Sequence, residues 1–236
     1  MSSGFLGASA TLRRMSDRRL GTLASLLGLT LLVYAMVGVR FLYSGNLTYG
    51  ALIWNLFLAW IPFALALAVY DGFRRGAARF PLIAGAVFWL IFFPNAPYIV
   101  TDIKHLRTWT GMPIWYDVIL VGAAAWTGLA LGFASLYLMQ AVVRRLAGAA
   151  NAWLFALVVL GLSSFGVYLG RYLRWNSWDL IVRPERVLGD VWTGIANPLA
   201  YPHAVAVTVV FTVFLAATYL AFYSVARSGL LEPTEH

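Results

Sequence analysis

The sequence predicts an all-α protein, a polytopic membrane helix bundle of about six transmembrane helices. Hydrophobic residues make up 61% of the chain and charged residues 11%, and the mean hydropathy is +0.78. Soluble domains carry about 25% charged residues, so water is not the main solvent of this chain. The apolar windows reach the roughly 20 residues that a helix needs to cross a hydrocarbon core. They lack the alternation of barrel strands, which favours helices that satisfy their own backbone groups in lipid.

Six windows are long enough to span a membrane. They run approximately over residues 20–39, 49–70, 80–100, 115–143, 152–169 and 203–223. We interpret residues 20–226 as one transmembrane domain, with a basic cytoplasmic segment, 1–19, before it and a cytoplasmic tail, 227–236, after it. Between the fifth and sixth windows, a short interfacial helix is expected on the membrane surface. Its residues are Pro184, Glu185 and the apolar set Val187, Leu188, Val191, Trp192 and Ile195.

The basic residues orient the bundle, because cytoplasmic loops carry an excess of Lys and Arg. With the N-terminus inside, the larger share faces the cytoplasm: Arg13, Arg14, Arg18, Arg19, Arg74, Arg75, Arg79, Arg144, Arg145 and Arg227. The smaller share faces outside: Arg40, Lys104, Arg107, Arg171, Arg174, Arg183 and Arg186. Both termini are therefore expected in the cytoplasm.

Composition also excludes several function classes. The net charge of +8 does not predict nucleic-acid binding, because the basic residues are spread over short loops. The chain has no cysteine, which excludes disulfides, thiolate catalysis and cysteine metal ligands. Nucleotide-binding loops and nucleophile elbows are missing, so no familiar enzyme class is indicated and any cofactor stays unknown.

Two polar clusters, residues 92–109 and 170–180, interrupt the apolar sequence. Before the first, residues 80–93 give about 21 Å of helix, too little to cross the membrane. The third helix is therefore expected to break at Pro94 and Pro97, at membrane depth. Proline removes an amide donor, which leaves carbonyls near Leu90 and Phe93 without helical partners.

Asn95 has the donors and acceptors to serve such carbonyls. The break has two interpretations. It is a proline kink stabilised by Asn95, or it is a discontinuous helix that forms part of a substrate or ion site.

After the break, one helical face presents Thr101, Asp102 and His105, since residues 102 and 105 are separated by about 60° and residues 101 and 105 by about 40°. An Asp-x-x-His pair can hold a metal, or can orient the imidazole as a general base. Asp117 and His203 could complete a mixed metal site. The alternative is an interfacial network of ion pairs and hydrogen bonds.

The second cluster places Arg171 and Arg174 three residues apart, followed by Trp175 and Trp178. If the helix continues, they form a cationic and aromatic ridge that either binds a lipid head group or simply anchors the helix. Unpaired charges are costly near the membrane, so at least one of Asp102, Asp117 and Asp179 is expected within salt-bridge reach of Arg171 or Arg174. The candidate ligand-binding residues are Asn95, Tyr98, Thr101, Arg171, Arg174, Trp175, Asn176, Trp178 and Asp179.

The same residues carry a family resemblance. Phe93-Pro94-Asn95-Ala96-Pro97-Tyr98 with Thr101-Asp102 and His105-Leu106, and then Gly170-Arg171-x-x-Arg174-Trp175-Asn176-Ser177-Trp178-Asp179, resemble the signatures of domain-of-unknown-function family 1361. The resemblance covers most of the chain from the second to the sixth window. It implies a bacterial integral protein of the cytoplasmic (inner) membrane and implies no reaction.

Three function classes follow. The first is binding or transport of an anionic lipid or lipid-linked molecule by the arginines and the broken helix. The second is a membrane-embedded hydrolase or transferase acting on a lipid phosphate, with Asp102, His105 and Asp117 as catalytic groups. The third is a structural or assembly protein whose polar residues serve only its fold. The bilayer is the one partner that the sequence identifies, and protein partners stay unknown.

The topology is testable, because a chain without cysteine gives no labelling background. Residues 100–114 and 170–202 are expected outside, and residues 71–79 and 144–150 inside. In intact cells, a membrane-impermeant thiol reagent should label Arg186→Cys and leave Gly76→Cys unlabelled. Labelling of Gly76→Cys alone would reverse the orientation.

Overall fold

A computed structural model describes residues 3–106, 111–175, 177–186, 189, 192 and 201–228. Its helices are α1 (Ser3–Ser44), α2 (Ala51–Arg74), α3 (Arg79–Phe92), α4 (Asn95–Tyr98), the 3₁₀ helix η1 (Ile99–His105), α5 (Ile114–Tyr168), the π-helix η2 (Leu169–Leu173), α6 (Asp179–Val182) and α8 (Pro202–Ser228). The all-α prediction is confirmed for this part of the chain.

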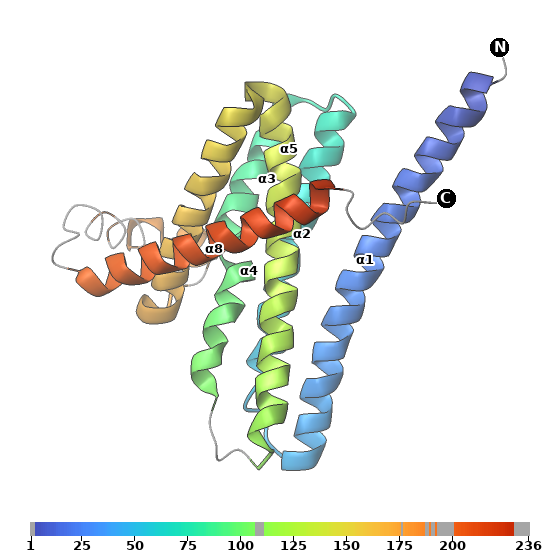
Figure 1. Ribbon diagram of the computed structural model, residues 1–236. Helices are drawn as coiled ribbons and strands as arrows, with labels where there is room; N and C mark the ends of the chain where they lie inside the picture. The colour runs from blue at the N-terminus through green and yellow to red at the C-terminus, as the bar shows by residue number, and fades with distance from the viewer. Residues whose placement is uncertain are drawn as a thin grey trace.

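The helices form an up-and-down bundle (Figure 1). Five stretches of the described chain are long and apolar enough to cross a membrane, the longest being Ile114–Leu173. That stretch is two helices, because it reverses direction at Gly148, whose φ of 86° suits glycine. Each of the six predicted windows therefore falls mainly within one helical stretch of membrane length, and the third stretch consists of α3, α4 and η1 in succession. The turn after α2 and the reversal at Gly148 lie at the same end of the bundle.

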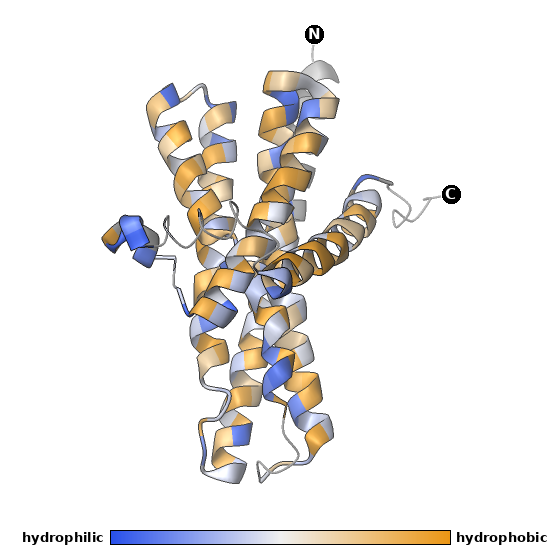
Figure 2. Ribbon diagram, turned by 90° about the vertical axis from the view of Figure 1, so that its left-hand side faces the viewer, coloured by the Kyte–Doolittle hydropathy of each residue, from blue (hydrophilic) through white to orange (hydrophobic). Residues whose placement is uncertain are grey.

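α8 differs from the other long helices in its direction. It runs obliquely across the bundle and rises over only a small part of the bundle's height (Figure 1). It packs on α5, where the buried Tyr219 hydroxyl donates a 2.6 Å hydrogen bond to Gln140 Oε1. Its residues are mostly apolar (Figure 2), and several of them, such as Val210 and Val213, are exposed, as expected for a helix that contacts lipid. The predicted sixth span is thus a helix that lies across its neighbours.

Glycines on α5 allow the broken third helix to approach closely. A Cβ atom at Gly128 would lie 2.6 Å from the Ala96 carbonyl oxygen, and one at Gly166 would lie 2.9 Å from Pro94 Cγ. Membrane helices commonly use small residues in this way, because they lack a strong hydrophobic drive to associate. The prolines therefore pack against a glycine-lined surface of α5.

The break itself is a change of helix type without a change of direction. α3, α4 and η1 follow one another along the bundle (Figure 1). The Asn95 side chain donates a 2.9 Å hydrogen bond to the Phe92 carbonyl, so Asn95 serves a carbonyl at the break as predicted. The prediction for Phe93 is wrong, because its carbonyl accepts a 3.1 Å bond from the Ala96 amide in the next turn.

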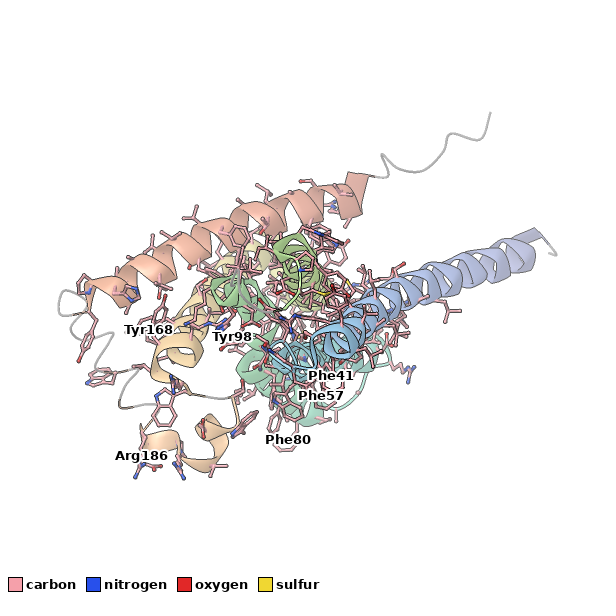
Figure 3. The ribbon with its side chains drawn as sticks, turned by 90° about the horizontal axis from the view of Figure 1, so that it is seen from below. Phe41, Phe57, Phe80, Tyr98, Tyr168 and Arg186 are labelled. Atoms are coloured by element: carbon pink, nitrogen blue, oxygen red, sulfur yellow. The ribbon has the colours of Figure 1, made fainter. Side chains whose placement is uncertain are left out.

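The expected surface helix before α8 lies largely outside the described residues. Val187, Leu188, Val191 and Ile195 belong to that undescribed part, as does Asn176. In the described part, α6 and residues 184–186 are helical, and Arg186 lies away from the bundle when the molecule is seen from below (Figure 3).

The close contact at Gly128 predicts a sharp packing effect. Gly128→Ala places a methyl group against the backbone oxygen of Ala96, so we expect a loss of about 1–3 kcal/mol, as for other overpacked cores. Thermal unfolding in detergent should report a lower midpoint. Gly122→Ala is the matched control on the same helix, since a Cβ there meets nothing within 4 Å. Equal midpoints for the two variants would contradict the close packing of α4 on α5.

Candidate functional site

The 3₁₀ geometry of η1 decides which side chains of the first polar cluster lie together. With three residues per turn, residues three apart stand directly above one another. Asp102 and His105 therefore form one row, and Tyr98 and Thr101 form the adjacent row. The sequence predicts a shared face on an α-helix, and the tighter helix aligns the Asp102 and His105 pair more closely.

Arg171 contacts all four of these residues. Its Nη2 lies 2.5 Å from Asp102 Oδ1, its Nε donates to Thr101 Oγ1 at 2.8 Å, and its Nη1 lies 2.9 Å from His105 Nε2. Its guanidinium carbon lies 4.6 Å from the centre of the Tyr98 ring, in a cation–π contact. The two polar clusters thus converge, and the predicted ion pair between them is confirmed.

The Asp102 carboxylate is fully engaged. Oδ1 binds Arg171, and Oδ2 accepts a 2.9 Å hydrogen bond from Asn55 Nδ2 on α2. The Arg171 and Asp102 side chains are each 8% exposed, so the pair is shielded from water and its charges cancel. Pairing offsets part of the free-energy cost of placing each charge near hydrocarbon.

His105 is bound at its ring and at its backbone. A guanidinium nitrogen only donates, so His105 Nε2 accepts from Arg171 and the imidazole carries its proton on Nδ1. The His105 carbonyl accepts a 3.1 Å hydrogen bond from the Tyr49 hydroxyl. The lone pair that a general base would use at Nε2 is therefore occupied in this state.

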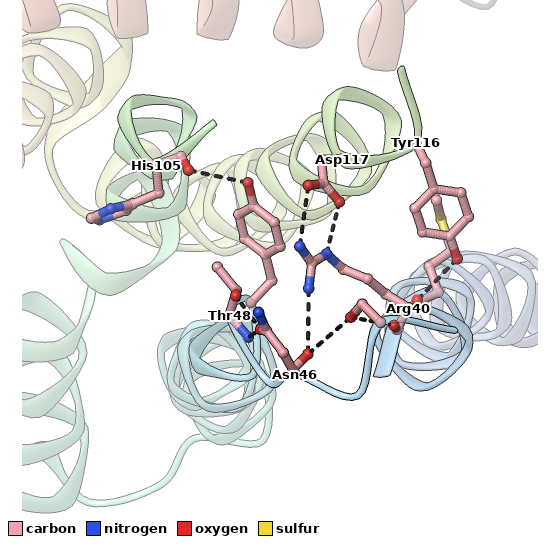
Figure 4. Close-up of polar contacts among 9 residues, drawn as sticks. Arg40, Asn46, Thr48, His105, Tyr116 and Asp117 are labelled. Atoms are coloured by element: carbon pink, nitrogen blue, oxygen red, sulfur yellow. Dashed lines mark hydrogen bonds and ion pairs between the residues drawn. The ribbon is translucent and has the colours of Figure 1, made fainter. Parts of the chain in front are cut away.

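Tyr49 connects this network to a second ion pair, and Figure 4 shows that pair, Arg40 with Asp117. Its ring lies 4.7 Å from the guanidinium carbon of Arg40. Arg40 Nε and Nη2 contact the two carboxylate oxygens of Asp117 at 2.8 and 3.3 Å, and Arg40 Nη1 donates to the Asn46 carbonyl at 3.3 Å. The Arg40 and Asp117 side chains are 2% and 0% exposed.

Asp117 therefore has a different partner from the one that sequence reasoning considered. The sequence groups Asp117 with Asp102 and His105, or with Arg171 and Arg174, whereas its carboxylate is held by Arg40 on α1. A signal for this pair exists in the sequence. Arg40 ends the first apolar window and Asp117 begins the fourth, so both lie at the same end of the bundle.

A cavity of about 330 Å³ lies beside the Arg171 and Asp102 pair, between α2, the broken third helix and the second half of α5. Its polar lining consists of Asn55, Asn95, Tyr98 and Ser177, and Asn95 Nδ2 donates to Ser177 Oγ at 2.8 Å. Its remaining lining is Trp54, Leu58, Leu90, Ile91, Pro94, Gly166, Leu169, Gly170 and Trp175. Two of its polar residues, Asn55 and Tyr98, also contact the ion pair.

The predicted ridge of arginines and tryptophans does not form on one helical face. The helix ends at Leu173, and Arg174 adopts a left-handed backbone with φ of 62° and is exposed. Trp175 lines the cavity, whereas Trp178 is 38% exposed and meets the Trp54 ring edge-on at 6.5 Å. Asp179 begins α6. Arg171 and Arg174 consequently have different environments.

The predicted mixed metal site is not assembled among the described residues, which hold no group of three His, Asp or Glu side chains with metal-binding spacing. His203, at the start of α8, packs instead against the Tyr172 ring with centroids 4.6 Å apart. Asp102 and His105 remain together, with Arg171 between their polar atoms.

Comparison with known families decides the relationship of the chain. Residues 54–218 match the family described as "Protein of unknown function (DUF1361)". The chain belongs to this family. The matched range contains Asn55, the whole Arg171 network around η1 and every residue that lines the cavity, whereas Arg40 and Tyr49 precede it. No curated protein and no solved structure matches the chain.

Substitutions of the two arginines of the second cluster are expected to differ in their effect on stability. Arg171→Gln leaves the Asp102 carboxylate buried without its cation, which costs about 3–5 kcal/mol in a buried pair. Arg174→Gln removes an exposed side chain and should leave thermal stability near that of the wild type. The double variant Arg171→Gln with Asp102→Asn should recover part of the loss. His105→Ala should stay folded, since His105 is exposed. A normal melting midpoint for Arg171→Gln would show that the pair is dispensable.

Proposed function

We propose that this membrane protein binds the polar head of an anionic lipid or lipid-linked molecule in the cavity between α2, the broken third helix and α5. The observation that carries the proposal is the lining of this cavity. Asn55, Asn95, Tyr98 and Ser177 contribute neutral hydrogen-bonding groups to the lining, and apolar and aromatic side chains form most of the rest. A concave, mostly apolar site with a few convergent polar groups is typical of ligand binding.

The anionic character of the ligand is inferred from Arg174. Trp175 lines the cavity, and Arg174, its neighbour in the chain, is exposed and forms no ion pair with another described residue. Arg171, in contrast, is already neutralised by Asp102. We therefore assign charge recognition to Arg174 and the support of the cavity wall to Arg171, which holds Tyr98 and, through Asp102, Asn55.

Binding or transport is favoured over catalysis because the proposed catalytic groups are engaged by cations. Arg171 binds both Asp102 and His105, and Arg40 binds Asp117. A hydrolase or transferase would first have to release these groups. The cavity requires no such rearrangement to accept a head group.

The test measures lipid that stays with the purified protein, by extraction and mass spectrometry. Ser177→Phe should fill the cavity and abolish retention of the bound species. Arg174→Gln should weaken its binding about tenfold, as expected for one lost hydrogen bond to a charged group, about 1.5 kcal/mol.

Arg183→Gln is the matched control, because Arg183 is also exposed but is not adjacent to a cavity-lining residue. Retention should be unchanged in this variant. If Ser177→Phe folds normally and keeps the same lipid in the same amount, the cavity is not the binding site.

A further inference from the structure

A second cavity lies in a different part of the bundle and uses none of the residues of the first. It has a volume of about 340 Å³ and is bounded by α1, α2, α5 and α8. Its lining is Arg19, Thr22, Leu23, Phe63, Leu67, Ala134, Tyr137, Leu138 and Phe222. α1 leans away from the rest of the bundle toward its N-terminal end (Figure 1), and the cavity occupies the side of α1 that faces α2 and α5.

We propose that this cavity holds one acyl chain of an anionic phospholipid, whose phosphate lies at the arginine-rich end of α1 and α2. The cavity lies between helices that span a membrane, so the molecules that reach it are lipids. Its polar lining comes from Arg19, Thr22 and Tyr137, and the remaining side chains are apolar. A lipid combines the same two chemistries, a charged head and an apolar chain.

The charge at the mouth of the cavity selects an anion. Arg19 makes a two-pronged contact with Asp71, with Nη2 to Oδ1 at 2.8 Å and Nη1 to Oδ2 at 3.3 Å. Arg74 and Arg75 also lie near enough to act on that carboxylate. One aspartate thus faces Arg19 directly and lies within electrostatic range of two further arginines, which leaves a surplus of positive charge for a phosphate group.

An aromatic ring organises the same arginines. The guanidinium carbons of Arg19 and Arg74 each lie 5.8 Å from the centre of the Tyr70 ring. This contact holds two cations on one residue at the end of α2. The head-group side of the proposed site is therefore built by side chains that contact each other.

The volume fits a chain and not a whole lipid. An apolar protein cavity of about 150 Å³ accommodates benzene, so this one has room for on the order of a dozen carbon atoms. Phe222 of α8 contributes to its lining, and the neighbouring Tyr223 meets the Tyr137 ring at 5.6 Å. α8 thus contributes one side of the cavity.

The experiment uses the full-length protein in phosphatidylcholine vesicles that contain a minor fraction of a phosphatidylglycerol with a diazirine on one acyl chain. After irradiation and digestion, mass spectrometry should find the label on peptides that contain Leu67 and Phe222. Ala134→Phe fills the cavity and should reduce this labelling severalfold. Ala150→Phe, at an exposed position just beyond the reversal at Gly148, is the control and should label like the wild type.

The identity of the head group is tested with a diazirine probe of the same chain length on phosphatidylcholine. Stronger labelling by the phosphatidylglycerol probe supports the arginine-rich mouth, and equal labelling by both overturns it. Unchanged labelling in folded Ala134→Phe overturns the cavity as the chain site. If Ala134→Phe does not fold, the positions of the label in the wild-type protein test the site. Label found only on peptides that do not line this cavity overturns it. Ser177→Phe, which fills the first cavity, should leave this labelling intact. The test of the second cavity is therefore independent of the test of the first.

Discussion

The structure depends on one constraint, which is that a charge surrounded by lipid or apolar side chains must meet an opposite charge. Two buried ion pairs meet it, Arg171 with Asp102 and Arg40 with Asp117. Each joins segments that are far apart in the chain. Arg40 ties α1 to the start of α5, and Arg171 ties the end of the same long stretch to η1. Between them they fix the relative positions of four membrane segments.

These two pairs act as a connected unit through Tyr49. The Tyr49 ring contacts Arg40, and its hydroxyl binds the backbone of His105, whose imidazole binds Arg171. A change at one pair therefore reaches the other through three contacts. Tyr49 and Arg40 lie outside the range that matches the family, whereas the Arg171 network lies inside it. The α1 segment thus adds a second support to a site that the matched range already contains.

The fold and the convergence of the polar clusters could both be predicted from the sequence, for physical reasons. Apolar windows of membrane length specify helices directly. A charged residue such as Arg171 among apolar residues requires an opposite charge, and Asp102 is a nearby carboxylate that can supply it. The order of the windows puts Arg40 and Asp117 at the same end of the bundle, but it does not single out this pair among the other charges at that end. The exposed, left-handed Arg174 could not be predicted. The helix ends at Leu173 after a π-helical turn, and residue spacing does not indicate such a turn. The cavity could not be foreseen, since its lining comes from α2, the broken third helix, the end of α5 and the segment after it, and residue spacing does not give the packing of these segments.

The oblique course of α8 has a consequence for the surrounding bilayer. A helix of 27 residues placed along the membrane normal would exceed the thickness of the hydrocarbon core, but α8 covers only part of the bundle's height. Lipids beside α8 therefore face a shorter apolar belt than lipids beside α2 or the first half of α5. Matching that belt requires local thinning of the membrane, at a cost of fractions of a kcal/mol per ångström. The protein is accordingly expected to thin the bilayer next to α8 and not next to α2, and to favour membrane regions that are already thin.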